Sequence, residues 1–240
     1  MRTPEFPIHL HSPRFVFRDF VETDRVDFVS YQMDARYRML YGHHDTAETR
    51  ARVDVGAPTA DRSNALFDRF LDWQHAEPRR NFQIGIFDRA TQNMLGCTGL
   101  RCRDEPARSA TFGIELAPSY WGHYRAAIEA TAAMIAYGFR ELDLITIIGD
   151  TASGNKRVAR LANWFGAEIT AERPGPDWMQ HRDWTEIDWS LNRHDWEQSE
   201  QKKQKGPNAH EDQDRSSQPY RNDAKTQSTS TTDNRRGEPI

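Results

Sequence analysis

The stretch from Tyr120 to Arg125 has the residue types and the spacing of an anion-binding turn. Gly122 lets the backbone turn, and the residues that follow are rich in alanine and free of proline, which favours a helix. The first turn of a helix presents unpaired amide groups that carry a partial positive charge. Such amides bind phosphate, and the guanidinium of Arg125 can add a fork of donors. The stretch therefore predicts recognition of a phosphate-bearing ligand.

The elements on either side of this turn must hold it in place. Residues 111–117 alternate apolar and polar side chains like a strand, which Pro118 ends because it lacks a backbone donor. Residues 126–142 carry one apolar face and predict a helix of about four to five turns. The apolar run 144–148 suits a parallel strand covered on both faces, and residues 149–151 are predicted to turn. The predicted unit is strand, phosphate turn, helix and strand.

A second helix begins at Asn155 and ends at Gly166, a residue suited to the left-handed position after a helix. Taken alone, Asn155 is explained equally well as the N-cap of this helix and as a binding residue.

The rest of the chain supplies further strands and helices. Apolar and polar residues alternate in the predicted strands and recur every three to four positions in the predicted helices. The strands are expected at 14–20, 81–88, 93–102, 108–117, 168–171 and 183–191, and helices are expected after Thr23 or Asp24 and over 61–75. The second, third and fourth of these strands should form an antiparallel meander.

The composition changes near residue 192. Beyond it the chain is rich in Gln, Ser, Asp, Lys and Arg and has hardly any aliphatic residues, so it cannot bury enough surface to offset its chain entropy. We expect one folded domain over residues 1–192 and a disordered polar tail over residues 193–240.

Charge and hydropathy argue against several classes of partner. A formal net charge of −4 gives no field that would gather nucleic acid over the whole surface. No apolar run is long enough to cross a bilayer, and residues 1–7 lack the core of a signal peptide. We therefore expect a cytoplasmic protein with neither nucleic acid nor membrane as partner.

Metal binding is not predicted either. Cys97 and Cys102 lie an odd number of residues apart in a strand-like stretch, so they face opposite sides and should be packed thiols. His43, His44 and Asp45 are adjacent, and adjacent side chains rarely converge on one ion, which favours a solvated loop.

In their order and their motifs, these residues resemble the GCN5-related N-acetyltransferases (GNAT), in particular the ribosomal-protein-acetylating, RimJ/RimL-like branch. The resemblance covers residues 12–191 and is strongest over 112–167. It rests on Pro118, Tyr120-Trp121-Gly122, Glu129-Ala130, the run 144–148, Asn155 and Phe165-Gly166. It implies an α/β (α+β) GNAT fold, in which helices flank a mixed, mostly antiparallel central sheet of about six to seven strands. A V-shaped splay would separate the two central strands.

The resemblance also implies that acetyl-CoA is the co-substrate. The pantetheine arm would lie between strands 111–117 and 144–148, with the pyrophosphate on the Gly122 turn and with Asn155 hydrogen-bonded to the pantetheine. The implied cofactor-binding residues are Leu116, Gly122, His123, Tyr124, Arg125, Ala126, Ala127 and Asn155.

Two features depart from the family pattern. The turn lacks the usual second small residue and has one extra residue before Glu129, so Tyr124 or Arg125 occupies crowded ground near the phosphates. Arg125 then either compensates as a phosphate ligand, or the loop is distorted and holds the cofactor weakly. Val158 stands where the branch often has a serine, so no general acid is assigned.

The chemistry implied is direct attack of an amine on a thioester, without a covalent enzyme intermediate. A backbone amide near Leu116 would stabilise the developing oxyanion, and Glu115 would act as a base directly or through water. The alternative for Glu115 is a solvated or salt-bridged strand residue. His123 and Tyr124 could move protons or could simply face solvent.

We therefore expect an N-acetyltransferase that acts on a primary amine, either a peptide or protein N-terminus or a small amine. The competing hypothesis is a non-catalytic acyl-CoA-binding or interaction module. Both a monomer and a homodimer are compatible with the sequence.

Overall fold

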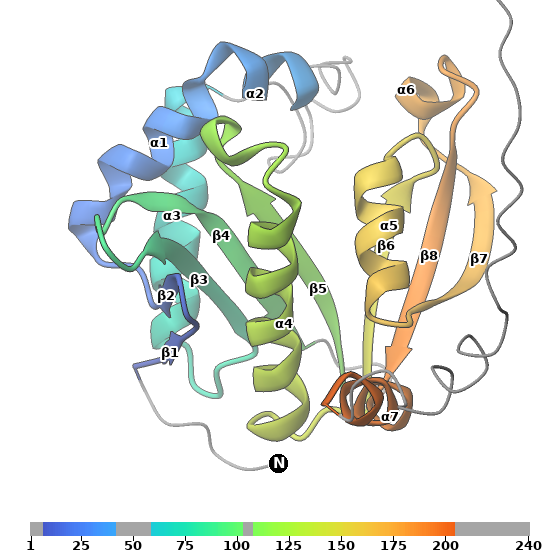
Figure 1. Ribbon diagram of the computed structural model, residues 1–240. Coiled ribbons are helices and arrows are strands. Elements are labelled where there is room, and N and C mark those ends of the chain that lie inside the picture. Colours follow the sequence, from blue (N-terminus) through green and yellow to red (C-terminus); the bar gives the residue numbers. More distant parts are fainter. Residues whose placement is uncertain (1–6, 42–58, 103–107, 205–240) are drawn as a thin grey trace, which may run out of the picture. The chain divides into compact units, whose positions relative to one another are not determined.

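The computed structural model describes residues 7–41, 59–102 and 108–204. Its centre is an eight-stranded sheet with the strand order β1-β2-β3-β4-β5-β6-β8-β7 (Figure 1). Neighbouring strands pair antiparallel except for β5 and β6, which are parallel. The strands are β1 (His9–His11), β2 (Phe15–Arg18), β3 (Asn81–Asp88), β4 (Met94–Arg101), β5 (Ser109–Leu116), β6 (Thr146–Ala152), β7 (Glu168–Pro174) and β8 (Thr185–Asn192).

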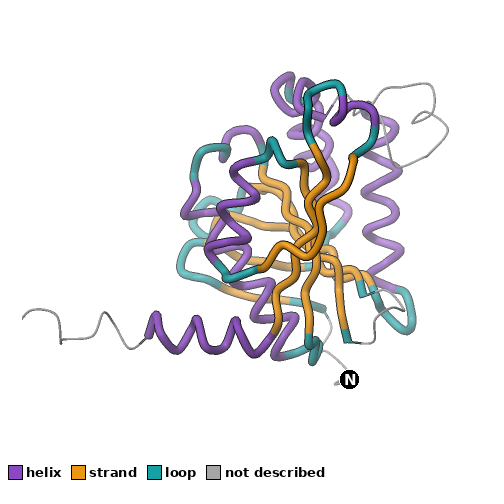
Figure 2. The backbone as a smooth tube through the Cα atoms, turned by 90° about the vertical axis from the view of Figure 1, so that its right-hand side faces the viewer, coloured by secondary structure: helices purple, strands orange, loops and turns teal. Residues whose placement is uncertain are grey.

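Helices cover both faces of this sheet (Figures 1 and 2). Helices α4 and α5 lie on one face, the α4 face, and helices α1 and α3 lie on the other, the α1 face. The helices are α1 (Arg25–Met33), α2 (Ala35–Tyr41), α3 (Ala60–His75), α4 (Tyr124–Arg140), α5 (Lys156–Trp164), α6 (Asp177–Gln180) and α7 (Arg193–Gln204). The mixed, mostly antiparallel α/β fold predicted from the sequence is confirmed.

Each face has its own apolar cluster, because side chains of a strand point alternately to its two faces. On the α4 face, Met134 and Ile135 of α4 pack with the buried Leu100 of β4. On the α1 face, Phe28 of α1 and Phe67 of α3 pack in a separate cluster. Free, buried cysteines belong to both clusters, Cys97 on the α1 face and Cys102 on the α4 face, as the odd spacing predicts.

The parallel pair β5 and β6 separates soon after it forms. Its register runs only from Ser109 opposite Thr146 to Thr111 opposite Ile148, although both strands continue beyond these residues. The two strands therefore splay apart, and this opening positions the candidate site described below.

Residues 149–151 continue β6 and do not turn, contrary to the sequence prediction. The antiparallel pairing with β8 extends β6 as far as Ala152. Gly149 has a packing role within the strand, because a Cβ there would lie 2.2 Å from an atom of the Trp189 ring. The sheet also has eight strands and not six to seven; the sequence prediction lacked the three-residue strand β1.

The chain remains helical past residue 192, where a disordered tail was expected to begin. Helix α7 spans Arg193–Gln204, and Trp196 is only 3% exposed within the α4-face cluster. Its ring lies 5.2 Å, centroid to centroid, from that of Phe139 in α4. One large aromatic side chain thus anchors a segment whose composition is otherwise polar. Residues 205–240 lie outside the described part of the chain.

In the described ranges, every helix is too short or too polar to cross a membrane.

Candidate active site

The turn that leads into α4 needs glycine for its backbone conformation. Gly122 has a φ of +91°, in the region that residues with a Cβ rarely adopt. A Cβ at this position would meet nothing within 4 Å, so the requirement comes from the dihedral angle and not from crowding. His123 then acts as the N-cap residue of α4, and its ring lies 5.5 Å from the ring of Tyr120.

Several amides of this turn already have backbone partners. Tyr124 donates to the Gly122 carbonyl at 2.9 Å, and Ala126 and Ala127 donate to the His123 carbonyl at 2.8 and 3.3 Å. The turn therefore presents fewer unpaired amides than the sequence predicts. The side chain of Arg125 is exposed, and its predicted role as a phosphate ligand stays a prediction.

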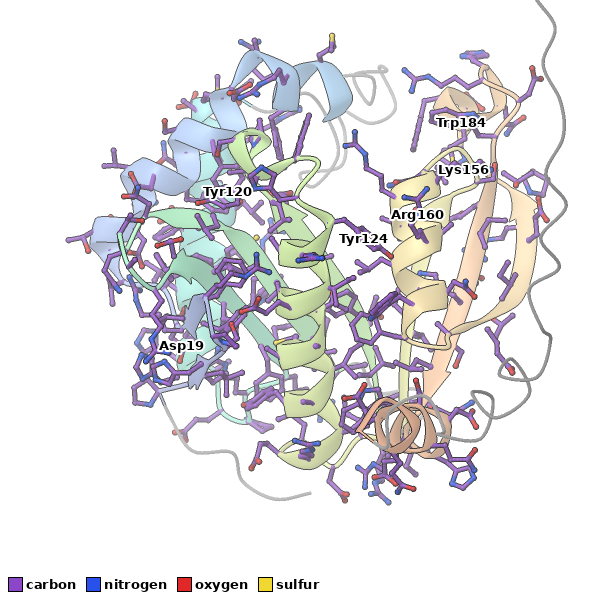
Figure 3. All side chains as sticks on the ribbon, viewed as in Figure 1. Asp19, Tyr120, Tyr124, Lys156, Arg160 and Trp184 are labelled. Atoms are coloured by element: carbon purple, nitrogen blue, oxygen red, sulfur yellow. The ribbon has the colours of Figure 1, made fainter. Side chains whose placement is uncertain are left out.

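Helix α5 brings more positive charge toward the same end of α4 (Figure 3). Lys156, Arg157 and Arg160 are exposed within its first five residues. The Tyr124 hydroxyl donates to the Arg160 carbonyl at 3.1 Å, and the Arg160 guanidinium lies 5.8 Å from the centre of the Tyr124 ring. Sequence reasoning missed this basic group, although three cations within five residues after a helix N-cap were a usable signal.

Asn155 is an N-cap in the structure. Its Oδ1 accepts a hydrogen bond from the Val158 amide at 3.3 Å. At the other end of α5, Gly166 has a φ of +79°, in the left-handed region that favours glycine after a helix. The capping bond explains why the helix begins here, and the predicted contact of Asn155 with pantetheine stays a prediction.

The amide of Leu116 points toward the opening between β5 and β6. Ala117 donates to the Leu95 carbonyl of β4 at 2.7 Å, and successive amides of a strand point to opposite edges, so the Leu116 amide points away from β4. On that same edge, the Trp121 indole Nε1 donates to the Leu116 carbonyl at 2.7 Å. A backbone donor thus lies at the edge of β5 where β6 has already separated.

A cavity of about 230 Å³ occupies this opening. Its lining on the α4 face is largely apolar and includes Ile135, Val158, Leu161, Ala162, Phe165 and Trp189. Arg101, Thr111 and Asp150 also line it. Their strand neighbours Leu100, Phe112 and Gly149 face the α4 side, so these three residues belong to the α1 face. The cavity therefore joins an apolar side of the sheet to a charged side.

Glu115 lies on the α1 face among hydroxyl donors. Tyr31 of α1 donates to its Oε1 at 2.6 Å, and Tyr37 of α2 donates to its Oε2 at 2.5 Å. The Gln32 amide adds a third bond at 3.3 Å. Among the described residues Glu115 forms no ion pair, and its carboxylate is held by hydrogen bonds from neutral side chains. A carboxylate has about four lone-pair sites, so capacity remains for a water molecule or an ammonium group.

The groups around Glu115 keep their protons at ordinary pH. Burial, followed by the nearby Cys97 and Glu115, raises the pKa of Tyr31 well above its usual value. Burial, with a further contribution from Glu115, also raises the pKa of the Cys97 thiol. Tyr31 therefore acts as a hydrogen-bond donor to Glu115, and Cys97 is held as a buried, protonated thiol.

The predicted site residues fall into two groups. Leu116, Gly122, Arg125 and the residues of the α4 start, including the buried Ala126 and the partly buried Ala127, lie near the opening on the α4 side. Glu115 lies on the α1 face, so the structure does not bring it together with Tyr124. Within the described ranges, no group of three or more His, Cys, Asp or Glu side chains is arranged to hold a metal ion. His43, His44 and Asp45 lie outside these ranges.

Strands β5 and β6 separate, and the cavity lies between them. A mixed α/β fold of this kind can hold an extended ligand between the two strands. The family model for the acetyltransferase (GNAT) domain matches residues 14–168, well over half of the chain. The chain belongs to the GNAT acetyltransferase family and is an acyltransferase.

Solved structures agree in fold. A GNAT-family acetyltransferase from Bacillus anthracis has 17% identity and a TM-score of 0.60, and the match covers 78% of this chain and 99% of that one. Ribosomal-protein-S5-alanine acetyltransferase from Vibrio fischeri has 16% identity and a TM-score of 0.57, with 79% and 98% covered. Spermidine N-acetyltransferase from Vibrio cholerae, solved with CoA and spermine, has 17% identity and a TM-score of 0.56, with 77% and 99% covered. No curated protein matches the chain.

Proposed function

We propose that this protein transfers the acetyl group of acetyl-CoA to a primary amine, either a peptide or protein N-terminus or a small amine. The observation that carries the proposal is a cavity that passes through the opening between β5 and β6. Its apolar side, formed by α4 and α5, suits the pantetheine arm, and its charged side suits a polar acceptor. The similarity to a ribosomal-protein acetyltransferase also supports a RimJ/RimL-like assignment.

Acetyl-CoA supplies the acetyl group in activated form, as a thioester. The acceptor nitrogen forms a bond to the carbonyl carbon, the carbon–sulfur bond breaks, the amine loses one proton and the sulfur gains one. The Leu116 amide, pointing into the opening, would donate to the carbonyl oxygen as negative charge develops there. Glu115, held by the two tyrosine hydroxyls, would take up the proton from the amine through water.

Charge on α5 supports the placement of the phosphates. Arg125, Lys156, Arg157 and Arg160 offer exposed cations near the start of α4, where the amides of the turn are largely engaged. Guanidinium groups bind phosphate oxygens through two parallel hydrogen bonds. These four side chains would therefore bind phosphate oxygens that free backbone amides would bind in an open turn.

A direct test is release of CoA thiol from acetyl-CoA with a panel of peptides and amines, together with the thermal shift that acetyl-CoA produces. We expect stabilisation by acetyl-CoA and turnover with at least one acceptor. Stabilisation without turnover would favour the acyl-CoA-binding module, which the engaged turn amides and Val158 support. If neither response is seen, both functions are contradicted.

Glu115→Gln should lower kcat/KM for the acceptor by about 100-fold or more, because general-base catalysis contributes on this scale. The acetyl-CoA affinity should stay unchanged, because Glu115 lies on the α1 face. Glu141→Gln, an exposed change at the end of α4, is the matched control. Equal kcat/KM values for the wild type and Glu115→Gln would remove Glu115 from the mechanism.

A further inference from the structure

Arg101, the last residue of β4, lines the cavity. Its side chain is half-buried, and its Nη2 lies 3.2 Å from the position that a Cβ on Gly113 would occupy. Among the described residues, no hydrogen bond or ion pair to its guanidinium is found. Arginine is always charged, and a partly buried charge is costly unless something compensates it. The cavity therefore contains a cation that is ready to receive an anion.

The surface beneath the guanidinium is shaped by two glycines. Gly99 and Gly113 are opposite each other in the β4–β5 register, two rows from the pair Arg101 and Thr111 and on the same face of the sheet. A Cβ at Gly99 would lie 2.4 Å from Oε1 of Gln83, whose side chain is 8% exposed. The Gln83 side chain therefore covers Gly99, whereas the missing side chain at Gly113 leaves room for the Arg101 guanidinium.

Negative charges lie on two sides of this cation. Glu115 is two residues beyond Gly113 on the same face of β5. Asp150 lines the cavity from β6, opposite Gly113 if the parallel register of Thr111 with Ile148 is continued. Neither forms an ion pair with Arg101 in the described part of the chain. A ligand that carries both an ammonium and an anionic group matches this alternation of charge, whereas a polyamine would be repelled by Arg101.

We propose that Arg101 selects the acceptor by binding a carboxylate that the acceptor carries at a distance from its amine. This proposal rests on the proposed acetyl transfer and specifies the acceptor class. The amine reacts beside the Leu116 amide, and the guanidinium lies over Gly113, three residues back along β5. Three residues of strand span about 10 Å. An α-amino acid is too short for that span, so the fitting acceptors are ω-amino acids with several methylene groups.

A series of acceptors of increasing length tests this directly. Glycine, 4-aminobutyrate and 6-aminohexanoate are compared as substrates, each beside its carboxamide, which lacks the negative charge. In the wild type, kcat/KM should rise along the acid series, and 6-aminohexanoate should exceed its amide by roughly 10- to 100-fold, the range for a hydrogen bond to a charged group. Equal rates for acid and amide would overturn the proposal.

Arg101→Gln should abolish the preference for the acid, so that 6-aminohexanoate and its carboxamide react with equal kcat/KM. Arg101→Lys keeps the positive charge but loses the two parallel N–H donors of the guanidinium, and it should retain part of the preference for the acid. Arg89→Gln, an exposed change in the turn before β4, should retain all of it. If Arg101→Gln still has a higher kcat/KM for 6-aminohexanoate than for its carboxamide, another group binds the carboxylate and the proposal is wrong.

Failure of this proposal can be told apart from failure of the acetyl transfer. Calorimetric titration with 6-aminohexanoate, with and without CoA, measures the acceptor site even if no turnover occurs. Binding to the wild type that is lost in Arg101→Gln supports the site. Absence of binding to the wild type, or equal binding to both proteins, rejects the site whatever the CoA titration shows.

Discussion

Tyr124 ties the start of α4 to α5. Its hydroxyl donates to the carbonyl of Arg160, and its half-buried ring packs against the α4-face cluster. Many relatives would have a small residue in this part of the turn, as the family resemblance implies. This hydrogen bond lies between α4 and α5, the two helices that would flank the nucleotide end of acetyl-CoA in the proposed function.

We expect Tyr124→Phe to strengthen CoA binding by roughly fivefold and to lower the stability of the free protein by about 1 kcal/mol, the worth of one hydrogen bond. The reason is that the bond to Arg160 must open when a ligand enters between α4 and α5. Isothermal titration with CoA and thermal melting measure the two effects, with Tyr120→Phe as control. A weaker CoA affinity in Tyr124→Phe would instead make the hydroxyl a ligand of the cofactor.

At the level of single residues, the sequence predicted the turn at Gly122 better than it predicted the surroundings of Glu115. Gly122 and Leu116 could be found because their neighbours in sequence define a strand end and a helix start. The contact of Glu115 with Tyr31 joins residues 84 positions apart, and that with Tyr37 joins residues 78 apart. No local pattern encodes such contacts, so the two tyrosine hydroxyls beside Glu115 could be found only from the fold.

At the level of elements, a single carboxylate fixes α4 to the turn between β1 and β2. Glu129 of α4 accepts hydrogen bonds from the Ser12 hydroxyl at 2.6 Å and from the Arg14 amide and Nε at 2.9 and 2.7 Å. Burial raises the pKa of Glu129, but these hydrogen bonds outweigh burial and leave the pKa below its usual value. Helix α4 is thereby held against the edge of the sheet that is far from the opening.

Glu129→Gln should lower the free energy of unfolding by about 1–2 kcal/mol at neutral pH. A lowered pKa in the folded state means that the stabilisation is present above the unfolded value of 4.5 and is lost as the pH falls through the folded value. The difference between the two proteins should therefore shrink below pH 4.5, as urea unfolding at several pH values would show. Glu168→Gln, exposed on β7, serves as control. A difference that is constant with pH would contradict an ionic origin.

Elements with a local signature were predicted well. The alternation in β3, β4 and β5 predicted the antiparallel meander, and the capping residue and periodicity predicted α5. The end of β6 was missed because its last residues, Gly149, Asp150 and Thr151, look like a turn in isolation. Their strand conformation depends on β8, about forty residues later in the sequence, and on Trp189 filling the space above Gly149.

At the level of the whole molecule, the folded part of the chain includes α7. Trp196 is buried against Phe139, and the guanidinium of Arg140 lies 5.2 Å from the centre of its ring. Composition alone placed the boundary at residue 192 because a single aromatic residue hardly changes the average of a polar segment. Burial of that one side chain is nevertheless large enough to order a helix.

Trp196→Ala should cost about 3–5 kcal/mol of stability, the usual penalty for deleting a buried Trp or Phe side chain. Truncation after residue 192 should be at least as costly, because it removes Trp196 with the rest of α7. Truncation after residue 204 should leave the melting temperature nearly unchanged, because the remaining segment has few residues able to bury apolar surface. Equal melting temperatures for the two truncated proteins would refute the role of α7.

The central claim is that acetyl-CoA binds in the opening between β5 and β6, and calorimetric titration with CoA tests it most directly. Ala162 lines the cavity, whereas Ala159 lies on the same helix, is exposed and does not line it. We expect one CoA to bind per wild-type chain, Ala162→Trp to abolish binding by filling the cavity, and Ala159→Trp to bind as the wild type does. Binding by Ala162→Trp that equals the wild type, or no heat from the wild type at all, would contradict the claim.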